Sequence, residues 1–310
     1  MGEQGRVAVI GGGLTGLTCA RALADAGHAV AVFDKGRGIG GRLATRRTEG
    51  GLRFDHGAQV LPATDPGFAA LLDTMVCDGH AAEWNDGFVG TPGMAQIPRA
   101  LAQGMDVYTG AMVTALDHGP TGWHLRGTGI DHHADTVVLA IPAPQARDLL
   151  GAGHAFVAPL AQVRYQASIT VMAGLDPEAP RPFVTHRGTG ALAWVAQDGA
   201  KPGRDGQPLT TWVVQADPDF SMTHIDLPFA ELADLIAPQL LDLLGARPDH
   251  LHHAVAHRWL YALTETALGQ PFLADDTTGL IVGGDWALGP HAEHGWASGR
   301  AMAAHLLARP

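Results

Sequence analysis

Short apolar runs and one helical pattern open the chain. Val7 to Ile10 is an apolar run of the kind that forms a strand buried on both faces of a parallel sheet. Residues 17–28 carry small and apolar side chains at helical spacing, and Gly27 ends this pattern. A second apolar run extends from Ala29 to Asp34. Strand, helix and strand in this order predict a right-handed βαβ unit.

The pattern changes twice in the middle of the chain. Residues 111–142 alternate short strand-like pieces with Gly, Pro and Asp turns and end in the apolar run TVVLAI, which predicts a β-meander that returns to the main sheet. Residues 151–274 contain the strand patterns SITVMAGL and LTTWVVQA. They also contain the amphipathic stretch 229–245, where Pro238 predicts a kink or a division. This part predicts a second, mixed α+β domain.

The last residues return to the pattern of the first domain. Residues 279–287 form an apolar strand pattern with a glycine turn, and Gly295 to Ala308 predicts a helix rich in small residues. The expected fold class is therefore α/β, with a Rossmann-like domain that includes a β-meander and a second mixed α+β domain that holds the substrate. We expect the first domain to comprise 1–75, 105–150 and 275–310, and the substrate domain to comprise 76–104 and 151–274.

Composition narrows the class of protein. The 310 residues are 46% hydrophobic and only 16% charged, which indicates a core-rich globular chain. The formal net charge of −11 argues against binding to nucleic acid or to an anionic membrane surface. No signal-peptide core or membrane-spanning run is present, and two cysteines give no disulfide framework, so we expect a cytoplasmic location. The 17 histidines show no HxH or HExxH pattern, and no metal site is expected.

A glycine signature follows the first strand. Gly11, Gly13 and Gly16 have the GxGxxG spacing between a strand and a helix, and Asp34 ends the next strand. The first glycine permits a tight turn, the second lets the backbone approach a pyrophosphate, and the third lets the helix pack close to the strand. Asp34 can accept hydrogen bonds from ribose hydroxyls. The combination predicts a dinucleotide site but does not distinguish NAD from FAD.

Two further motifs favour FAD. Arg37-x-x-Gly40-Gly41-Arg42-x-x-Thr45 resembles the second fingerprint of the glutathione-reductase-like FAD proteins, in their amine oxidase and renalase branch. Gly283-Gly284-Asp285 lies between a strand and a helix near the C-terminus, and NAD-only Rossmann enzymes lack this return. By this resemblance Asp285 binds a ribityl hydroxyl, and the helix that follows points its N-terminus at the flavin pyrimidine.

Over nearly its whole length the chain resembles bacterial renalase-type flavoproteins. The strings that carry this resemblance are FDHGAQ (54–59), LAWVAQDGAKPGR (192–204), TTWVVQADPDFS (210–221) and HRWLYA (257–262). The resemblance implies noncovalently bound FAD. The residues it assigns to FAD are Gly11, Gly13, Leu14, Thr15, Gly16, Asp34, Lys35, Gly41, Arg42, Leu43, Gly57, Ala58, Gln59, Val113, Gly284, Asp285, Trp296, Ala297 and Ser298. The side chains expected around the substrate are those of His56, Gln59, Trp194, Trp212 and Trp286.

The resemblance also implies a reaction. Renalases take a hydride from 2- or 6-dihydro isomers of NAD(P)H and pass the electrons to O2, so the expected partners are a dihydronicotinamide and O2, and the products are NAD(P)+ and H2O2. A dihydropyridine is already a hydride donor, so no catalytic side chain is predicted beyond those that orient it. An FAD-dependent amine oxidase is the main alternative, although its usual lysine has only Lys35 and Lys201 as candidates. An FAD-binding protein without turnover is a third possibility.

Overall fold

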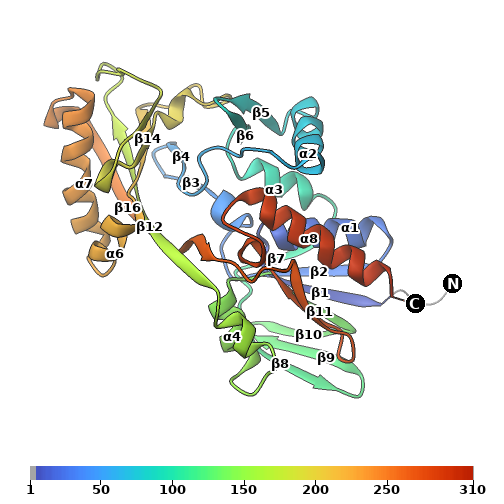
Figure 1. Ribbon diagram of the computed structural model, residues 1–310. Coiled ribbons are helices and arrows are strands. Elements are labelled where there is room, and N and C mark those ends of the chain that lie inside the picture. Colours follow the sequence, from blue (N-terminus) through green and yellow to red (C-terminus); the bar gives the residue numbers. More distant parts are fainter. Residues whose placement is uncertain (1–4, 310) are drawn as a thin grey trace.

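A six-stranded sheet forms the centre of the computed structural model, which describes residues 5–309 (Figure 1). The strand order is β17-β18-β11-β1-β2-β7, and all neighbours are parallel except β17 and β18. This is the predicted Rossmann-like sheet. Its strands are β1 (Arg6–Ile10), β2 (Ala29–Asp34), β7 (Asp106–Thr109), β11 (Thr136–Leu139), β17 (Phe272–Asp275) and β18 (Leu280–Gly283).

Two helices from opposite ends of the chain cover one face of this sheet. Helix α1 (Leu14–Asp25) and helix α8 (Ala292–Leu307) lie side by side (Figure 1), and a Cβ on Gly299 would lie 2.4 Å from the Thr15 carbonyl oxygen. Helix α1 begins three residues before the predicted segment because Gly13 is its N-cap. Helix α8 likewise begins three residues before the expected Gly295. These helices and the sheet enclose the largest cluster of buried apolar side chains.

The predicted meander lies against the other face of the sheet. It consists of β8 (Val113–Gly119), β9 (Gly122–Gly127) and β10 (Ile130–Ala134), which pair in antiparallel order before the chain enters β11. Trp123 and Leu125 of β9 pack with the buried side chains of β1 and β11. The chain then passes through α4 (Ala143–Leu150) and α5 (Val157–Leu160) to the second domain.

An antiparallel sheet in the order β13-β14-β15-β12-β16 builds the second domain. Helix α7 (Phe229–Leu244) covers one face, and Pro238 lies inside this helix without dividing it. The other face is turned toward the first domain (Figure 1). The remaining elements of the domain are β12 (Arg164–Leu175), β13 (Thr185–Arg187), β14 (Trp194–Ala196), β15 (Thr210–Gln215), α6 (Pro218–His224) and β16 (Leu251–Thr266).

The segment 76–104, which we expected to belong to the substrate domain, packs on helices of the first domain. Its buried side chains Ala81, Val89, Met94, Ile97 and Leu101 belong to the same core cluster as those of α1 and α8, rather than to the cluster under α7. Apolar packing therefore joins this segment to the first domain. The elements within this segment are β5 (Ala81–Trp84), β6 (Gly87–Gly90) and α3 (Gln96–Leu101). They follow β3 (Thr45–Arg47), β4 (Arg53–Asp55) and α2 (Pro66–Cys77) along the chain. No helix within residues 5–309 is long and apolar enough to cross a membrane.

Candidate FAD site

The first glycine loop has the close backbone contacts that its sequence predicts. Gly11 has a φ of +111°, and a Cβ there would lie 2.3 Å from the Ala140 carbonyl oxygen. A Cβ on Gly16 would lie 2.0 Å from the Gly11 carbonyl oxygen. Asp34 accepts hydrogen bonds from the backbone N–H of Gly12 at 2.7 Å and of Gly36 at 2.6 Å. From the end of β2, the Asp34 carboxylate therefore holds the first glycine loop and the start of the second by hydrogen bonds.

Two backbone hydrogen bonds and one ion pair between side chains bring the four predicted cofactor segments together. The Gly40 N–H donates to the Gly12 carbonyl at 2.7 Å, which joins the second glycine loop to the first. The Ala58 N–H donates to the Arg42 carbonyl at 2.9 Å, which adds the FDHGAQ segment. The Arg42 guanidinium then lies 2.6 Å from the carboxylate of Asp285, which adds the C-terminal motif. Segments far apart in the sequence thus form one continuous surface.

Arg42 is held by two partners. Its Nη1 donates to the Ala262 carbonyl at 2.9 Å, and its Nη2 pairs with Asp285. Burial favours the neutral form of Arg42, but the Asp285 carboxylate outweighs burial and raises the pKa of Arg42 above its ordinary value. The side chain is therefore a fixed cation at the junction of the four segments.

These residues fit FAD. No side chain caps the N-terminus of α1, so its first backbone N–H groups remain free to bind a pyrophosphate. Within residues 5–309, no atom beyond Gly13 and its two chain neighbours lies within 4 Å of an ideal Cβ on Gly13, which leaves room for a ligand to approach the backbone there. Arg42 adds a fixed positive charge nearby. Of the other predicted contacts, Lys35 is exposed and donates to Gln145, whereas Leu14, Leu43 and Val113 are buried core side chains.

We expect the substitution Arg42→Met to weaken FAD binding by about tenfold, because it removes a charged hydrogen-bond donor and leaves Asp285 without its partner. Fluorescence titration of the apoprotein with FAD measures this change. Arg37 lies in the same motif but is exposed, so Arg37→Met is the matched control. Equal affinities for the two variants would contradict an FAD-binding role for Arg42.

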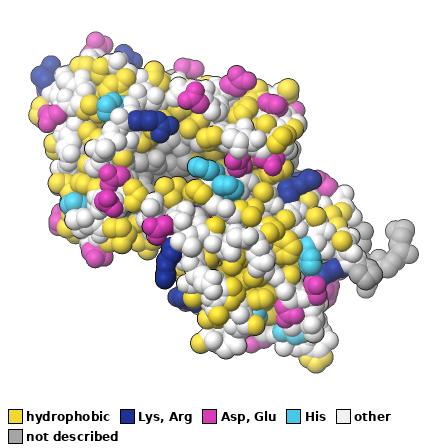
Figure 2. Space-filling view, viewed as in Figure 1, with side chains coloured by type: hydrophobic (Ala, Val, Ile, Leu, Met, Phe, Trp, Pro, Cys, Tyr) yellow, Lys and Arg dark blue, Asp and Glu magenta, His cyan; other side chains and the backbone are white. Residues whose placement is uncertain are grey.

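The face of the second sheet opposite α7 lies over the FDHGAQ segment. In the strand register Arg187, Trp194, Gln215, Thr170 and His257 lie next to one another across the five strands and share this face. Gln215 Nε2 donates to the Gly57 carbonyl at 2.7 Å. This row of residues, which we call the roof row, therefore lies directly over Gly57. Figure 2 shows a hollow between the two parts of the molecule, with histidine and basic side chains at its edge.

The predicted tryptophans occupy different places. Trp194 is in the roof row, where the Arg187 guanidinium lies 4.4 Å from its ring centroid. Trp212 points to the opposite face of the same sheet and is fully buried among the side chains under α7. Trp286 is buried beside the meander and donates to the Ile141 carbonyl at 3.0 Å. We therefore do not retain Trp212 and Trp286 among the residues proposed to contact substrate.

The C-terminal helix is anchored by the side chains of Trp296 and Ser298, two of the residues that the resemblance assigns to FAD. Because α8 begins at Ala292, residues Trp296, Ala297 and Ser298 lie in its second turn rather than at its N-terminus. The buried Ser298 hydroxyl accepts from the Gly284 N–H at 3.1 Å and donates to the Pro271 carbonyl at 2.7 Å. Trp296 packs on Phe68 of α2.

His56 lies in an aromatic cluster below the roof. Its ring is 4.8 Å from that of His257 and 5.2 Å from that of Trp259, whose Nε1 donates to the His56 carbonyl. Burial, followed by the nearby His257 and Arg46, lowers the pKa of His56 to about 4. His56 is therefore neutral at pH 7, and its Nδ1 is buried without a hydrogen-bond partner.

The lowered pKa of His56 predicts a loss of stability on acidification. Between pH 6.5 and pH 4 the unfolded chain binds a proton at this side chain and the folded chain does not, so His56 favours unfolding increasingly as the pH falls through this range. From pH 7 to pH 5 we expect the wild type to lose on the order of 1–2 kcal/mol more than the variant His56→Gln. Urea unfolding at both pH values measures the difference. Identical pH dependence in the two proteins would refute the prediction.

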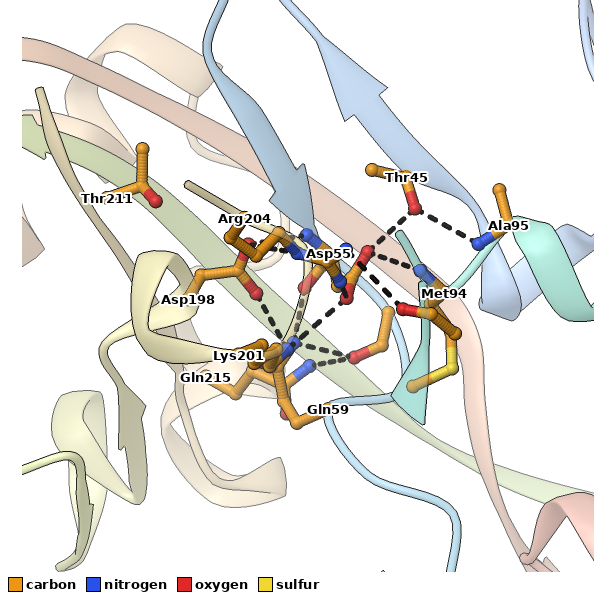
Figure 3. Close-up of polar contacts among 12 residues, drawn as sticks. Thr45, Asp55, Gln59, Met94, Ala95, Asp198, Lys201, Arg204, Thr211 and Gln215 are labelled. Atoms are coloured by element: carbon orange, nitrogen blue, oxygen red, sulfur yellow. Dashed lines mark hydrogen bonds and ion pairs between the residues drawn. The ribbon is translucent and has the colours of Figure 1, made fainter. Parts of the chain in front are cut away.

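Four buried charged side chains lie beside the FDHGAQ segment (Figure 3). Asp55 pairs with Lys201 and Arg204, and Asp198 pairs with the same two cations; none of the four side chains is exposed. Burial raises the pKa of Asp55, but the two cations and donors from Thr45 and Met94 outweigh it and hold the pKa below its ordinary value. Burial and the Asp55 charge together raise the pKa of Asp198.

Sequence reasoning did not find Asp55, Asp198, Gln215 or His257. The signal was present in TTWVVQA and HRWLYA, because side chains alternate between the two faces of a strand. If Trp212 packs under α7, Gln215 must point to the other face.

A second group not anticipated from the sequence lies on the meander. His124 and His133 stack across β9 and β10 at 4.3 Å, and Asp131 lies 2.7 Å from His124 Nε2. One ligand atom from each of the three lies within 4.8 Å of the others, so this group could hold a transition metal. The expectation of no metal site considered only the spacing of histidines along the sequence, whereas this grouping depends on the register between β9 and β10.

Comparison with known proteins agrees with this site. Residues 9–75 match an NAD(P)-binding Rossmann-like domain, and residues 80–307 match the model of the flavin-containing amine oxidoreductases. The chain belongs to the flavin-containing amine oxidoreductase family. It is therefore an FAD-dependent oxidoreductase of the amine oxidase family. The glycine motifs predicted an FAD protein of this family, and the match confirms that part of the prediction.

Individual curated proteins match only a short segment of this amine oxidoreductase. It is 38% identical over 70 residues to 15-cis-phytoene desaturase from Synechococcus elongatus, a match that covers 23% of this chain and 15% of that protein. It is 38% identical over 60 residues to 4,4'-diapophytoene desaturase from Staphylococcus aureus, covering 19% of this chain and 12% of the relative. The matches thus span only a small part of the curated relatives.

Solved structures show the same fold along the whole chain. A provisionally named protoporphyrinogen oxidase from Exiguobacterium sp. has a TM-score of 0.77 at 13% identity, with 99% of each chain covered. Wild-type putrescine oxidase has a TM-score of 0.70 at 15% identity, also with 99% of each chain covered. Cyclohexylamine oxidase from Brevibacterium oxydans has a TM-score of 0.71 at 14% identity, covering 98% of this chain and 100% of that one. At these identities the similarity establishes the fold of the amine oxidoreductase.

Proposed function

We propose that this flavoprotein, with noncovalently bound FAD, oxidises 2- or 6-dihydro isomers of NAD(P)H. The balanced reaction is dihydronicotinamide plus O2 plus a proton, giving NAD(P)+ and H2O2. When bound, FAD accepts the hydride and supplies the two electrons that reduce O2. The chain's own residues bind and orient the two ring systems, and the proposal requires no protein base because a dihydropyridine donates hydride directly.

The state of Lys201 is the observation that carries this proposal. Its ammonium is fully buried and donates to Asp198, Asp55 and Gln59, so its three hydrogens all have partners within the protein. The other lysine, Lys35, is exposed and donates to Gln145 beside the predicted adenosine end. The engaged hydrogens of Lys201 argue against the role that many amine oxidases give to a lysine, which is to hold a water against the flavin. A reaction without that water fits these residues better.

Charges near the roof support an anionic substrate. Burial lowers the pKa of His257, and the positive charges of Arg46 and Arg258 lower it further. These two arginines would repel a cation added beside His257. Arg187 lies at the edge of the roof row on the Trp194 ring, where a guanidinium could pair with a phosphate. A dinucleotide brings a planar ring and a pyrophosphate, whereas an amine substrate brings a positive charge. The electrostatics therefore favour the dinucleotide.

One observation favours the alternative, an FAD-dependent amine oxidase. Tyr165 and Tyr261 form an aromatic pair at 5.1 Å between β12 and β16, and amine oxidases often place paired aromatic rings beside the flavin. The Tyr165 hydroxyl accepts from the Ala143 N–H at 3.0 Å, and the rings meet at 61° rather than facing each other as parallel walls. The comparisons also support this alternative, and they support it better than the dihydronicotinamide reaction, because the matching family is that of flavin-containing amine oxidoreductases and two similar structures are amine oxidases by name.

Anaerobic stopped-flow spectroscopy of the yellow protein tests the proposal. The substrates are 2- and 6-dihydronicotinamide dinucleotides, ordinary 4-dihydro NADH and a panel of primary amines. We expect rapid loss of the flavin band with the first pair alone, followed by recovery and H2O2 formation when O2 is admitted. Bleaching by an amine but not by the dihydronicotinamides would establish the alternative. FAD released by denaturation and recovered in the filtrate would verify noncovalent binding.

A further inference from the structure

The buried charged group links the substrate domain to the flavin side of the molecule. Lys201 and Arg204 lie on the turn after β14, whereas Asp55 ends β4 in the FDHGAQ segment. Lys201 Nζ donates to Asp198 Oδ1 at 2.6 Å, to Asp55 Oδ2 at 3.4 Å and to Gln59 Oε1 at 3.2 Å (Figure 3). The Trp84 ring lies on its other side at 5.4 Å. The ammonium is thus fixed in place.

Lys201 holds the Oε1 end of the Gln59 amide. An ammonium group only donates, so the Gln59 atom that faces it must be the carbonyl Oε1. The amide Nε2 is then directed to the main-chain carbonyls of Asp55 and of Gly57, the latter at 3.1 Å. Without Lys201 the Oε1 end of the amide would lose its hydrogen bond, and the side chain would be held only through Nε2.

Gln59 in turn holds the peptide that follows Gly57. The Gly57 carbonyl accepts from Gln59 Nε2 on one side and from Gln215 Nε2 on the other. A Cβ on Gly57 would lie 2.0 Å from the Arg42 carbonyl oxygen, so this backbone packs directly on the second glycine loop. A small rotation of the Gly57 peptide would change which backbone groups Gly57 and Ala58 present to the cofactor.

We infer that Lys201 is a positioning residue of the FAD site. From the substrate domain it orients the Gln59 amide, and through Gln59 it fixes the Gly57–Ala58 peptide against Arg42. The backbone surface beside the flavin is therefore completed only when the turn that carries Lys201 is seated on Asp55. This inference rests on the proposed FAD binding but not on the identity of the substrate.

Arg204 supplies the matched control. It belongs to the same buried group, where its Nη2 pairs with Asp55 and its Nη1 donates to the Gly90 carbonyl at 3.4 Å, but it has no hydrogen bond to Gln59. Removal of either cation disrupts the buried charges. Only removal of Lys201 also takes away the hydrogen bond to Gln59 Oε1. The variants Lys201→Met and Arg204→Met therefore separate positioning from general stability.

The readouts are the flavin absorption and circular dichroism spectra of the FAD-loaded protein and its dissociation constant for FAD. For Lys201→Met we expect an altered flavin spectrum and about tenfold weaker FAD binding. For Arg204→Met we expect a comparable loss of thermal stability with the wild-type spectrum. Equal spectral changes in the two variants, or none in Lys201→Met, would overturn the inference.

The variant Gln59→Met covers the case in which Lys201→Met does not fold, because it retains all four buried charges. Gln59→Met should itself alter the flavin spectrum in the way expected for Lys201→Met. Where the double variant Gln59→Met/Lys201→Met folds, its spectrum should be that of Gln59→Met. A wild-type spectrum and FAD affinity in Gln59→Met would refute the inference. A wild-type protein that binds no FAD would instead refute the proposed function, so the two failures are distinguishable.

Discussion

Replacing Asp55 with Ala should lower the free energy of unfolding by about 3–5 kcal/mol, which is the largest effect that we expect of a single substitution here. Asp55 is the carboxylate that pairs with both buried cations, and no part of its side chain is exposed. Its removal leaves Lys201 and Arg204 with Asp198 alone, whose own pKa is raised by burial. It also removes the acceptor of the Met94 N–H and of the Thr45 hydroxyl. Chemical denaturation of the apoprotein measures the change.

Asp131 is the control for this experiment because it also forms an ion pair but its side chain is 81% exposed. Water replaces its partner when it is removed, so Asp131→Ala should leave the free energy of unfolding nearly unchanged. A change of less than about 1 kcal/mol in Asp55→Ala would mean that the buried cations find other partners or lose their protons at little cost.

Replacing Gly16 with Val should yield a protein that retains little FAD on purification, with binding weakened by roughly 100-fold. The first added carbon would lie 2.0 Å from the Gly11 carbonyl oxygen and 3.1 Å from the Ala140 side chain. Neither backbone can move aside, since β1 lies at the centre of the sheet, so α1 must shift away from the glycine loop. The free N–H groups at its N-terminus would shift with it. The absorbance ratio of flavin to protein measures the loss.

Gly38 in the second glycine loop is the matched position, because no atom lies within 4 Å of an ideal Cβ there. Gly38→Val should keep wild-type FAD content. If both variants lose FAD equally, the loss reflects the stiffness of the loops rather than the position of α1.

Local patterns predicted the first domain well. The glycine spacing, the acid at the end of β2 and the C-terminal Gly-Gly-Asp motif each lie in a short segment, and the structure joins these segments by backbone contacts near Arg42. The Rossmann-like sheet and the family followed from those motifs.

The second domain was less predictable because its site depends on pairings between strands. Trp212 and Gln215 are three residues apart and point to opposite faces, yet only Gln215 reaches the FDHGAQ segment. Asp55 and Arg204 meet although 149 positions separate them, and the sequence KPGR resembles an ordinary solvated turn. Apolar packing likewise placed 81–101 with the first domain, although no motif marks that segment.

The route of the chain through the central sheet has a consequence for synthesis on the ribosome. The chain leaves the sheet after β11 at Leu139 and returns only at Phe272, when it adds β17, β18 and finally α8. Arg42 emerges early, but its partner Asp285 emerges after the entire second domain. Domains fold as units and the N-terminal part appears first, so β11 stays without its neighbour β18, and α1 without its neighbour α8, until the second domain has been made. Because Asp285 is among the proposed FAD contacts, we expect FAD capture to follow the synthesis of residues 285–307.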